Sequence, residues 1–139
     1  MKRKRLNVMV VDDSPTVLTH LRYALERAGH DVTTRDSALG TMSEVMRLKP
    51  QALVLDVSMP ALGGDKLASL VAEFRKDVVI ILHSSRSESE LAELAAASGA
   101  KGYIAKTADS VRFLSEFHRL VLGEGVAFPA AAAAGRGRT

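Results

Sequence analysis

The sequence predicts one α/β domain, built on a doubly wound parallel sheet of five strands with five helices. Short apolar runs alternate along the chain with segments whose apolar residues recur at helical spacing, and this order indicates strand–helix crossovers. The runs are almost continuously apolar, which is typical of strands buried on both faces of a parallel sheet. The expected strands cover residues 6–11, 30–35, 52–56, 78–82 and 102–105.

Residues that begin and end helices flank the helical segments in the first half of the chain. Ser14 can cap a helix and Pro15 suits its first position, while Gly29 predicts its end. Asp36 or Ser37 is expected to cap the second helix. The apolar stripes of the second and third helices are expected to contain Ala38, Met42, Val45 and Met46, and Leu67, Leu70, Val71 and Phe74, respectively.

The second half of the chain carries similar signals. Ser87 and Glu90 match the capping box, in which each side chain accepts a hydrogen bond from the backbone of the other. Gly99 predicts the end of that fourth helix. Asp109 is expected to cap the last helix, and Gly123 follows its final apolar residues.

Composition and charge restrict the possible functions. The 139 residues include no cysteine, which excludes disulfides and thiolate metal sites. The net charge is +3, but residues 2–5 contribute four positive charges and Arg136 and Arg138 two more, so the rest of the chain carries about −3. This mildly acidic body argues against nucleic acid as the partner of the domain.

The same features suggest a simple domain organisation. Residues 1–5 are expected to form a basic N-terminal extension, residues 6–122 the folded domain, and residues 123–139 a disordered tail rich in Ala, Gly and Arg. No apolar run approaches the roughly 18 residues of a membrane span, and no signal-peptide pattern is present. A cytoplasmic location without a membrane partner is therefore expected.

Polar side chains follow four of the predicted strands. Asp12 and Asp13 come after the first strand, Asp56 ends the third, Ser84 follows the fourth, and Lys106 follows the fifth. The carboxyl ends of parallel strands meet at one edge of a sheet, where ligands of such folds bind. We therefore expect these five side chains to lie together.

This set of residues indicates phosphoryl chemistry with a divalent cation. Three carboxylates suit Mg²⁺, which prefers oxygen ligands, and a carboxylate can also be a nucleophile that forms an aspartyl phosphate. A lysine and a hydroxyl could then stabilise the phosphoryl oxygens. Each residue also has a simpler interpretation: Asp13 could favour a helix N-terminus, Lys106 could be a solvated charge, and Ser84 could be a turn residue.

Several motifs together resemble the receiver domain of two-component response regulators, of the CheY-like type. They are Val10-Val11-Asp12-Asp13-Ser14, the segment from Asp56 through Met59-Pro60 to Gly64, Ser84, and Gly99-Ala100-Lys101-Gly102-Tyr103-Ile104-Ala105-Lys106. The resemblance extends over residues 6–122. It implies a flavodoxin-like sheet with strand order 2-1-3-4-5.

The resemblance also implies a role for each matching residue. Asp56 would accept a phosphoryl group from a histidine kinase or a phosphotransfer protein. Asp12, Asp13 and Asp56 would bind Mg²⁺, with the backbone carbonyl of Ser58 as a further ligand. Ser84 and Lys106 would contact the phosphoryl group, and Tyr103 would be the switch aromatic, which turns inward as the Ser84 hydroxyl moves.

Three positions bear on how such a site would work. The family usually has a proline joined by a cis bond after its lysine, but Thr107 stands here, and a cis bond to a non-proline residue costs about 3–4 kcal/mol. We therefore predict a trans Lys106–Thr107 bond and a shifted loop. Ser58 and Arg86 occupy the positions that tune dephosphorylation in the family.

Three functional hypotheses follow from the sequence. The first is a phosphorylation switch, not an enzyme with a separate substrate, that changes the surface of the fourth helix, fifth strand and last helix to control a partner protein. Leu91, Leu94 and Tyr103 are candidates for that surface. The second is a receiver fold that serves as an unphosphorylated scaffold, and the third is a Mg²⁺-dependent phosphohydrolase. The chain could be a whole protein or a receiver cut from a longer one.

Overall fold

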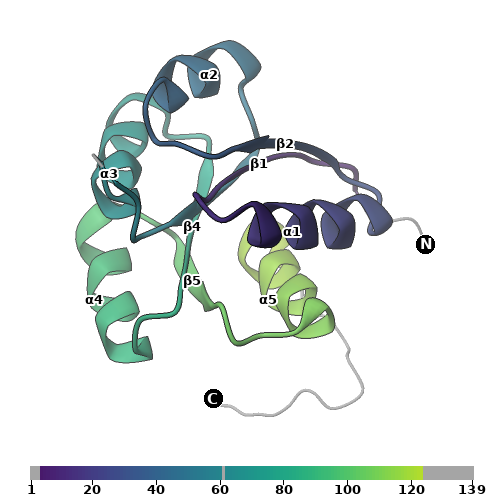
Figure 1. Cartoon of the computed structure of the whole chain (residues 1–139). Helices are drawn as coiled ribbons and strands as arrows, with labels where there is room; N and C mark the ends of the chain where they lie inside the picture. The colour runs from purple at the N-terminus through teal and green to yellow at the C-terminus, as the bar shows by residue number, and fades with distance from the viewer. Residues whose placement is uncertain (1–3, 61, 124–139) are drawn as a thin grey trace.

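The computed structural model describes residues 4–60 and 62–123, where the expected strands and helices alternate (Figure 1). The strands are β1 (Asn7–Val11), β2 (Asp31–Arg35), β3 (Ala52–Asp56), β4 (Val79–Ser84) and β5 (Gly102–Ala105). The helices are α1 (Pro15–Arg27), α2 (Thr41–Leu48), α3 (Gly64–Phe74), α4 (Glu88–Ser98) and α5 (Ser110–Leu122). The predicted tail from residue 124 and residues 1–3 of the predicted extension lie outside the described residues.

The five strands form one parallel sheet in the order β2-β1-β3-β4-β5, so the predicted fold class is confirmed. β1 and β3 are neighbours in this sheet, and Val11 lies opposite Leu55. Strand β4 extends two residues beyond its expected end, which brings His83 opposite Asp56. The carboxyl ends of β1, β3, β4 and β5 thus form one edge.

The sheet separates two hydrophobic cores, because alternate residues of a strand point to opposite faces. Val8, Val10 and Val54 pack on the side of α1 and α5. Met9 and Leu53 pack on the side of α2, α3 and α4. Figure 1 shows these two groups of helices on the two faces of the sheet.

Most helix ends form as the sequence predicts. The side chains of Ser14, Ser87 and Asp109 accept hydrogen bonds from the backbone N–H groups of Val17, Glu90 and Arg112 at 3.3, 3.3 and 2.9 Å. Each of these bonds satisfies a backbone donor that the first helical turn leaves without a partner.

The predicted cap of the second helix is wrong. α2 begins at Thr41, after Gly40 with a φ of 78°. Ser37 instead stabilises the preceding turn: its Oγ accepts from the Leu39 N–H at 3.1 Å, and its carbonyl accepts from the Thr41 hydroxyl at 2.8 Å. A serine can bond its own local backbone in a turn as readily as it caps a helix, so the residue type alone does not fix the start.

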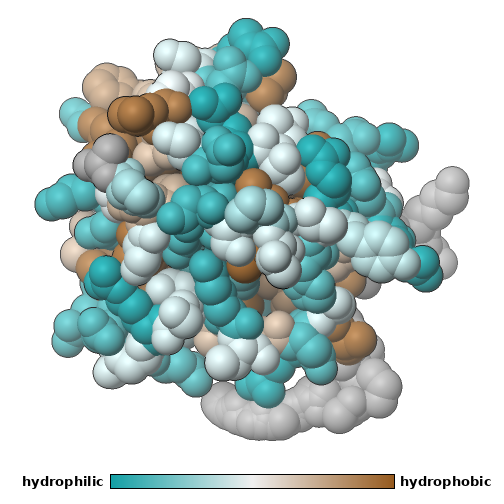
Figure 2. Space-filling view, viewed as in Figure 1, coloured by the Kyte–Doolittle hydropathy of each residue, from teal (hydrophilic) through white to brown (hydrophobic). Residues whose placement is uncertain are grey.

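The predicted apolar stripes of α2 and α3 are only partly buried. Val45, Leu67 and Val71 are inside, whereas Met46, Leu70 and Phe74 are exposed. Figure 2 shows hydrophobic surface at its upper left, where Figure 1 places α2 and α3. Within residues 4–60 and 62–123, no helix has the length and apolarity that crossing a membrane requires.

Two phenylalanines should show how much the core on the α1–α5 side contributes to stability. Phe117 is 0% exposed and Phe74 is 60% exposed. We expect Phe117→Ala to lower the free energy of unfolding by about 3–5 kcal/mol, because it leaves a cavity in a close-packed core. The matched control, Phe74→Ala, should change it by less than about 0.5 kcal/mol. Urea titration followed by circular dichroism measures both free energies of unfolding. Equal losses of stability in the two variants would contradict the placement of Phe117 in the core and Phe74 on the surface.

Candidate functional site

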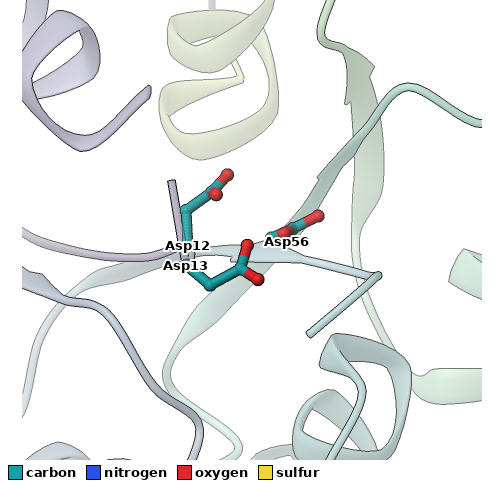
Figure 3. A group of neighbouring side chains, drawn as sticks. All are labelled: Asp12, Asp13 and Asp56. Carbon is teal, nitrogen blue, oxygen red and sulfur yellow. The ribbon is translucent and has the colours of Figure 1, made fainter. Parts of the chain in front are cut away.

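Three carboxylates meet at the ends of β1 and β3 (Figure 3). One oxygen from each of Asp12, Asp13 and Asp56 lies within 4.8 Å of the other two. Asp12 and Asp56 are 1% and 4% exposed, while Asp13 is exposed. The sheet therefore brings the three acids together as predicted, and it buries two of them.

Local backbone turns hold the two buried acids in place. The Asp12 N–H donates to the Arg35 carbonyl at 3.0 Å, which continues the strand pairing one residue past β1. Asp12 Oδ1 then accepts from the Ser14 N–H at 2.9 Å, and Asp56 Oδ1 accepts from the Ser58 N–H at 3.2 Å. Each carboxylate thus binds the backbone two residues later, a turn that Asp forms readily.

Lys106 reaches both buried carboxylates from the end of β5. Its Nζ lies 2.9 Å from Asp12 Oδ2 and 3.4 Å from Asp56 Oδ1. The described segments contain no cis peptide bond, so the prediction of a trans Lys106–Thr107 bond is confirmed. The Lys106 N–H donates to the Ser84 carbonyl at 2.9 Å, which keeps the start of this loop against β4.

The site carries an excess of negative charge. Burial raises the pKa of Asp56, and the neighbouring Asp12 charge raises it further, against the opposing effects of the Ser58 N–H and Lys106. For Lys106, burial alone would lower the pKa, but hydrogen bonding and charge from Asp12 and Asp56 outweigh it and leave the pKa raised. One ammonium therefore faces three carboxylates.

One positive charge is shared between the two buried carboxylates. Asp12 Oδ2 is buried and lies 2.9 Å from Lys106 Nζ, which is also 3.4 Å from Asp56 Oδ1. Burial of the remaining negative charge is costly unless a further cation binds. Together with the oxygen-only ligand set, this excess of negative charge makes the cluster fit Mg²⁺.

The loop after β3 requires glycine at Gly64. A Cβ placed there would collide with the backbone carbonyl of Asp56. The Gly64 N–H also donates to the Val57 carbonyl at 3.1 Å, which draws the start of α3 up against the site. The glycine pair after Pro60 thus allows the helix backbone to approach the central acid closely.

The other predicted residues lie around this centre. Ser84 ends β4, is 1% exposed, and its Oγ accepts from the Arg86 N–H at 3.1 Å. Tyr103 is partly buried on the α2–α3–α4 side of β5, and its hydroxyl lies 3.4 Å from Glu88 Oε1, to which it donates. Burial raises the pKa of Tyr103, and the charge of Glu88 adds to the effect. Leu91, expected on the surface, is fully buried and cannot contact a partner.

His83 is a residue at this edge that the sequence did not mark. It lies opposite Asp56 in the sheet, is 5% exposed, and contacts the Phe113 ring edge to face at 5.5 Å between centroids. Burial lowers its pKa to about 3, with smaller contributions from Lys106 and His20. His83 is therefore neutral near pH 7 and adds no second cation to the site. The sequence predicted that β4 ends at residue 82, so the pairing of His83 with Asp56 could not be inferred until the structure showed that β4 reaches Ser84.

The molecule is a doubly wound α/β domain. Its sheet carries, at the carboxyl edge, a cluster of three carboxylates, two of which are bridged by Lys106. Residues 8–118 match the family described as the response regulator receiver domain. The chain belongs to this family, and the resemblance of its motifs is confirmed.

Two relatives are similar to most of this chain. The chain is 32% identical over 127 residues to the "Uncharacterized 14.6 kDa protein in sodA1 3'region" of Leptolyngbya boryana, covering 90% of this chain and 94% of that one. It is 30% identical over 99 residues to the "Alkaline phosphatase synthesis transcriptional regulatory protein PhoP" of Bacillus subtilis, covering 71% of this chain. The alignment covers 41% of PhoP, so this chain matches less than half of that regulator.

A solved structure shows the same fold at lower sequence identity. The chemotaxis response regulator CheY4 of Vibrio cholerae superposes with a TM-score of 0.78 at 22% identity, covering 84% of this chain and 99% of CheY4. Receiver domains of this family are signalling switches rather than enzymes in general.

Removing the charge of Asp56 should stabilise the metal-free protein. A carboxyl group whose pKa is higher in the folded state than in the unfolded chain disfavours folding once it is ionised. We therefore expect Asp56→Asn to raise the free energy of unfolding at pH 7 by on the order of 1 kcal/mol, and this gain should shrink as the pH falls and Asp56 is protonated. Urea titrations in chelator from pH 7 to pH 4 measure it.

Asp77 is the control for this prediction. It is exposed and paired with Arg75, whose hydrogen bond lowers its pKa. Asp77→Asn should leave stability unchanged or slightly reduced at pH 7, the opposite sign to Asp56→Asn. A loss of stability in Asp56→Asn at pH 7 would show that the carboxylate cluster is not repulsive.

Proposed function

We propose that this domain is a phosphoacceptor switch, in which Asp56 receives a phosphoryl group from a phosphohistidine of a histidine kinase or phosphotransfer protein. The observation that carries the proposal is the position of Asp56: a buried carboxylate at the end of the central strand, 3.4 Å from Lys106 and beside two further acids. Family membership supports the same function.

The transfer follows from the groups at the edge of the sheet. A carboxylate oxygen of Asp56 attacks phosphorus, a new P–O bond forms, and the P–N bond of the donor breaks with its electron pair returning to the imidazole. Lys106 offsets the negative charge that gathers on the phosphoryl oxygens. The Ser84 hydroxyl, at the end of the adjacent strand, would turn from the Arg86 N–H to a phosphoryl oxygen.

The acidic cluster is proposed to hold Mg²⁺. Asp12, Asp13 and Asp56 would be its protein ligands, with the backbone carbonyl of Ser58 from the turn after Asp56. When bound, the ion neutralises the carboxylates and the incoming phosphoryl oxygens. The excess of three carboxylates over the single ammonium of Lys106 supports this assignment.

Phosphorylation is proposed to change the surface formed by α4, β5 and α5. The Tyr103 hydroxyl is 3.4 Å from the exposed Glu88 carboxylate. A shift of Ser84 toward the phosphoryl group would leave room for the Tyr103 ring to turn inward, and the contact with Glu88 would then break. Tyr103 and the partly buried Leu94 remain candidates for contact with a downstream partner protein.

The scaffold and phosphohydrolase hypotheses have less support. Thr107 left room for the scaffold hypothesis because it stands where the family usually has a proline, yet Lys106 lies in ion-pair range of Asp12 and Asp56 with a trans bond. A phosphohydrolase would need a binding surface for its substrate, and the sequence motifs and the family match favour the switch.

Intact mass spectrometry tests the phosphoacceptor. Incubation with acetyl phosphate and Mg²⁺ should add the mass of one phosphoryl group to the wild type and none to Asp56→Asn. Asp65→Asn, which alters a carboxylate in the first turn of α3, should be modified like the wild type. Modification of Asp56→Asn, or none of the wild type, would contradict the proposal.

Isothermal titration calorimetry tests the metal site. Asp13 is the exposed member of the cluster, so Asp13→Asn should leave the fold intact. We expect it to weaken Mg²⁺ binding by about tenfold or more, which corresponds to about 1.4 kcal/mol or more. Asp36→Asn alters an exposed acid just after β2 and should bind Mg²⁺ like the wild type. Equal affinities of Asp13→Asn and the wild type would remove Asp13 from the ligand set.

A further inference from the structure

The outward face of α3 is hydrophobic and, together with one side chain of α2, is exposed. Met46 on α2 and Leu70 and Phe74 on α3 are 46%, 40% and 60% exposed. Figure 2 shows hydrophobic surface over these two helices. The other large hydrophobic side chains that residues 4–60 and 62–123 expose are on three separate segments: Tyr23 on α1, Leu39 before α2 and Val111 on α5. A gathering of exposed apolar side chains on one face marks an interaction surface.

The other faces of α3 are already occupied. Leu67, Ala68 and Val71 are buried in the core on this side of the sheet. Ala72 faces α4, because a Cβ added at Gly99 would lie only 2.8 Å from the Ala72 Cβ. The outward face is therefore the one that α3 presents to another molecule.

An arginine fixes the two helices that carry this surface. Arg75 Nη1 donates to the Val45 carbonyl at 3.4 Å, and the Asp77 carboxylate accepts from the same guanidinium at 2.7 and 3.0 Å. Val45 and Arg75 directly adjoin Met46 and Phe74 in the chain, so this contact holds the two exposed side chains on neighbouring helix ends. The surface is thus formed before a partner binds, which reduces the entropy lost on association.

Two opposite charges flank Leu70 on α3. Lys66 lies one helical turn before Leu70, and Glu73 lies about one turn after it. Both are exposed, and in the part of the chain that the structure describes neither belongs to an ion pair. On the adjacent helix, by contrast, Arg47 is paired with Glu44 at 2.6 Å. Lys66 and Glu73 are therefore available to charges on another molecule.

We propose that the outward face of α3 binds a second copy of this chain across a two-fold axis, with the two α3 helices antiparallel. An axis beside Leu70 brings the apolar side chains of both copies together. Lys66 and Glu73 are equally distant along the helix from the point between Ser69 and Leu70, so Lys66 of each copy then lies opposite Glu73 of the other. The face is thus complementary to itself, as a two-fold interface requires.

This interface is separate from the proposed phosphoacceptor site. The first residue of α3, Gly64, lies against Asp56, whereas Leu70 and Phe74 are in the second half of the helix. Dimerisation therefore needs no phosphoryl group on Asp56, and Asp56→Asn should dimerise like the wild type.

Sedimentation equilibrium on the full chain tests the dimer. Helix α3 has 11 residues, about 16 Å, so its face buries less than the roughly 800 Å² per partner of a standard interface. We therefore expect a reversible dimer that is populated toward about 500 µM and dissociates near about 5 µM. Leu70→Ser should weaken it by about tenfold or more, while Leu39→Ser, at an exposed leucine outside the face, should not. A monomer at every concentration, or an unaffected Leu70→Ser dimer, would overturn the proposal.

Charge reversal tests the antiparallel arrangement. Lys66→Glu or Glu73→Lys alone puts like charges opposite each other at both ends of the interface, and each should weaken association by about tenfold or more. The double variant Lys66→Glu/Glu73→Lys restores opposite charges and should recover the wild-type affinity. Both changes favour the helix dipole, since position 66 is in the first turn of α3 and position 73 in the last, so α3 should stay folded.

Mixing the two single variants separates the interface from any effect on folding. In a mixed pair, opposite charges face each other at both ends again, so an equimolar mixture of Lys66→Glu and Glu73→Lys should dimerise although neither does so alone. Native mass spectrometry identifies the heterodimer from the two chain masses. A mixture that stays monomeric, or a double variant that does not recover, would overturn the two-fold arrangement.

Discussion

The crowding of three carboxylates at one sheet edge is the constraint on which the rest of this structure depends. Two of the acids are nearly fully buried, and like charges so placed repel each other unless cations and donors surround them. The surrounding parts each reduce that cost: the backbone N–H groups of Ser14 and Ser58, and the ammonium of Lys106. The parallel sheet supplies the rigidity, because the acids lie at or just after the ends of β1 and β3, and each of these strands pairs with a neighbour on both sides.

Much of this could be predicted from the sequence because a parallel sheet collects strand ends. Once the apolar runs were recognised, Asp12, Asp56, Ser84 and Lys106 had to share an edge, whatever their separation along the chain. Residue-level packing could not be predicted in the same way. The turn that uses Ser37 in place of a helix cap, and the exposure of Leu70 and Phe74, depend on how far a short helix extends over the sheet.

The histidines show the limit most clearly. His30 and His118 are separated by 88 residues and belong to no local pattern, so only the packing of α5 brings them together. Helix α5 is consequently held at two places. Near its N-terminal end, Asp109 caps it three residues after Lys106, and toward its C-terminal end His118 bonds to the α1–β2 turn.

The alternation of residues along β5 has a consequence for how such a domain can diverge. Ile104 faces the α1–α5 core, as do Val10 and Val54, while Tyr103 packs on the opposite face with α4. The proposed readout residue Tyr103 thus lies on the opposite face of the sheet from Ile104. Mutations that remodel the α4 side to suit a new partner need not disturb the carboxylates, so the partner could change while the acidic cluster stays the same.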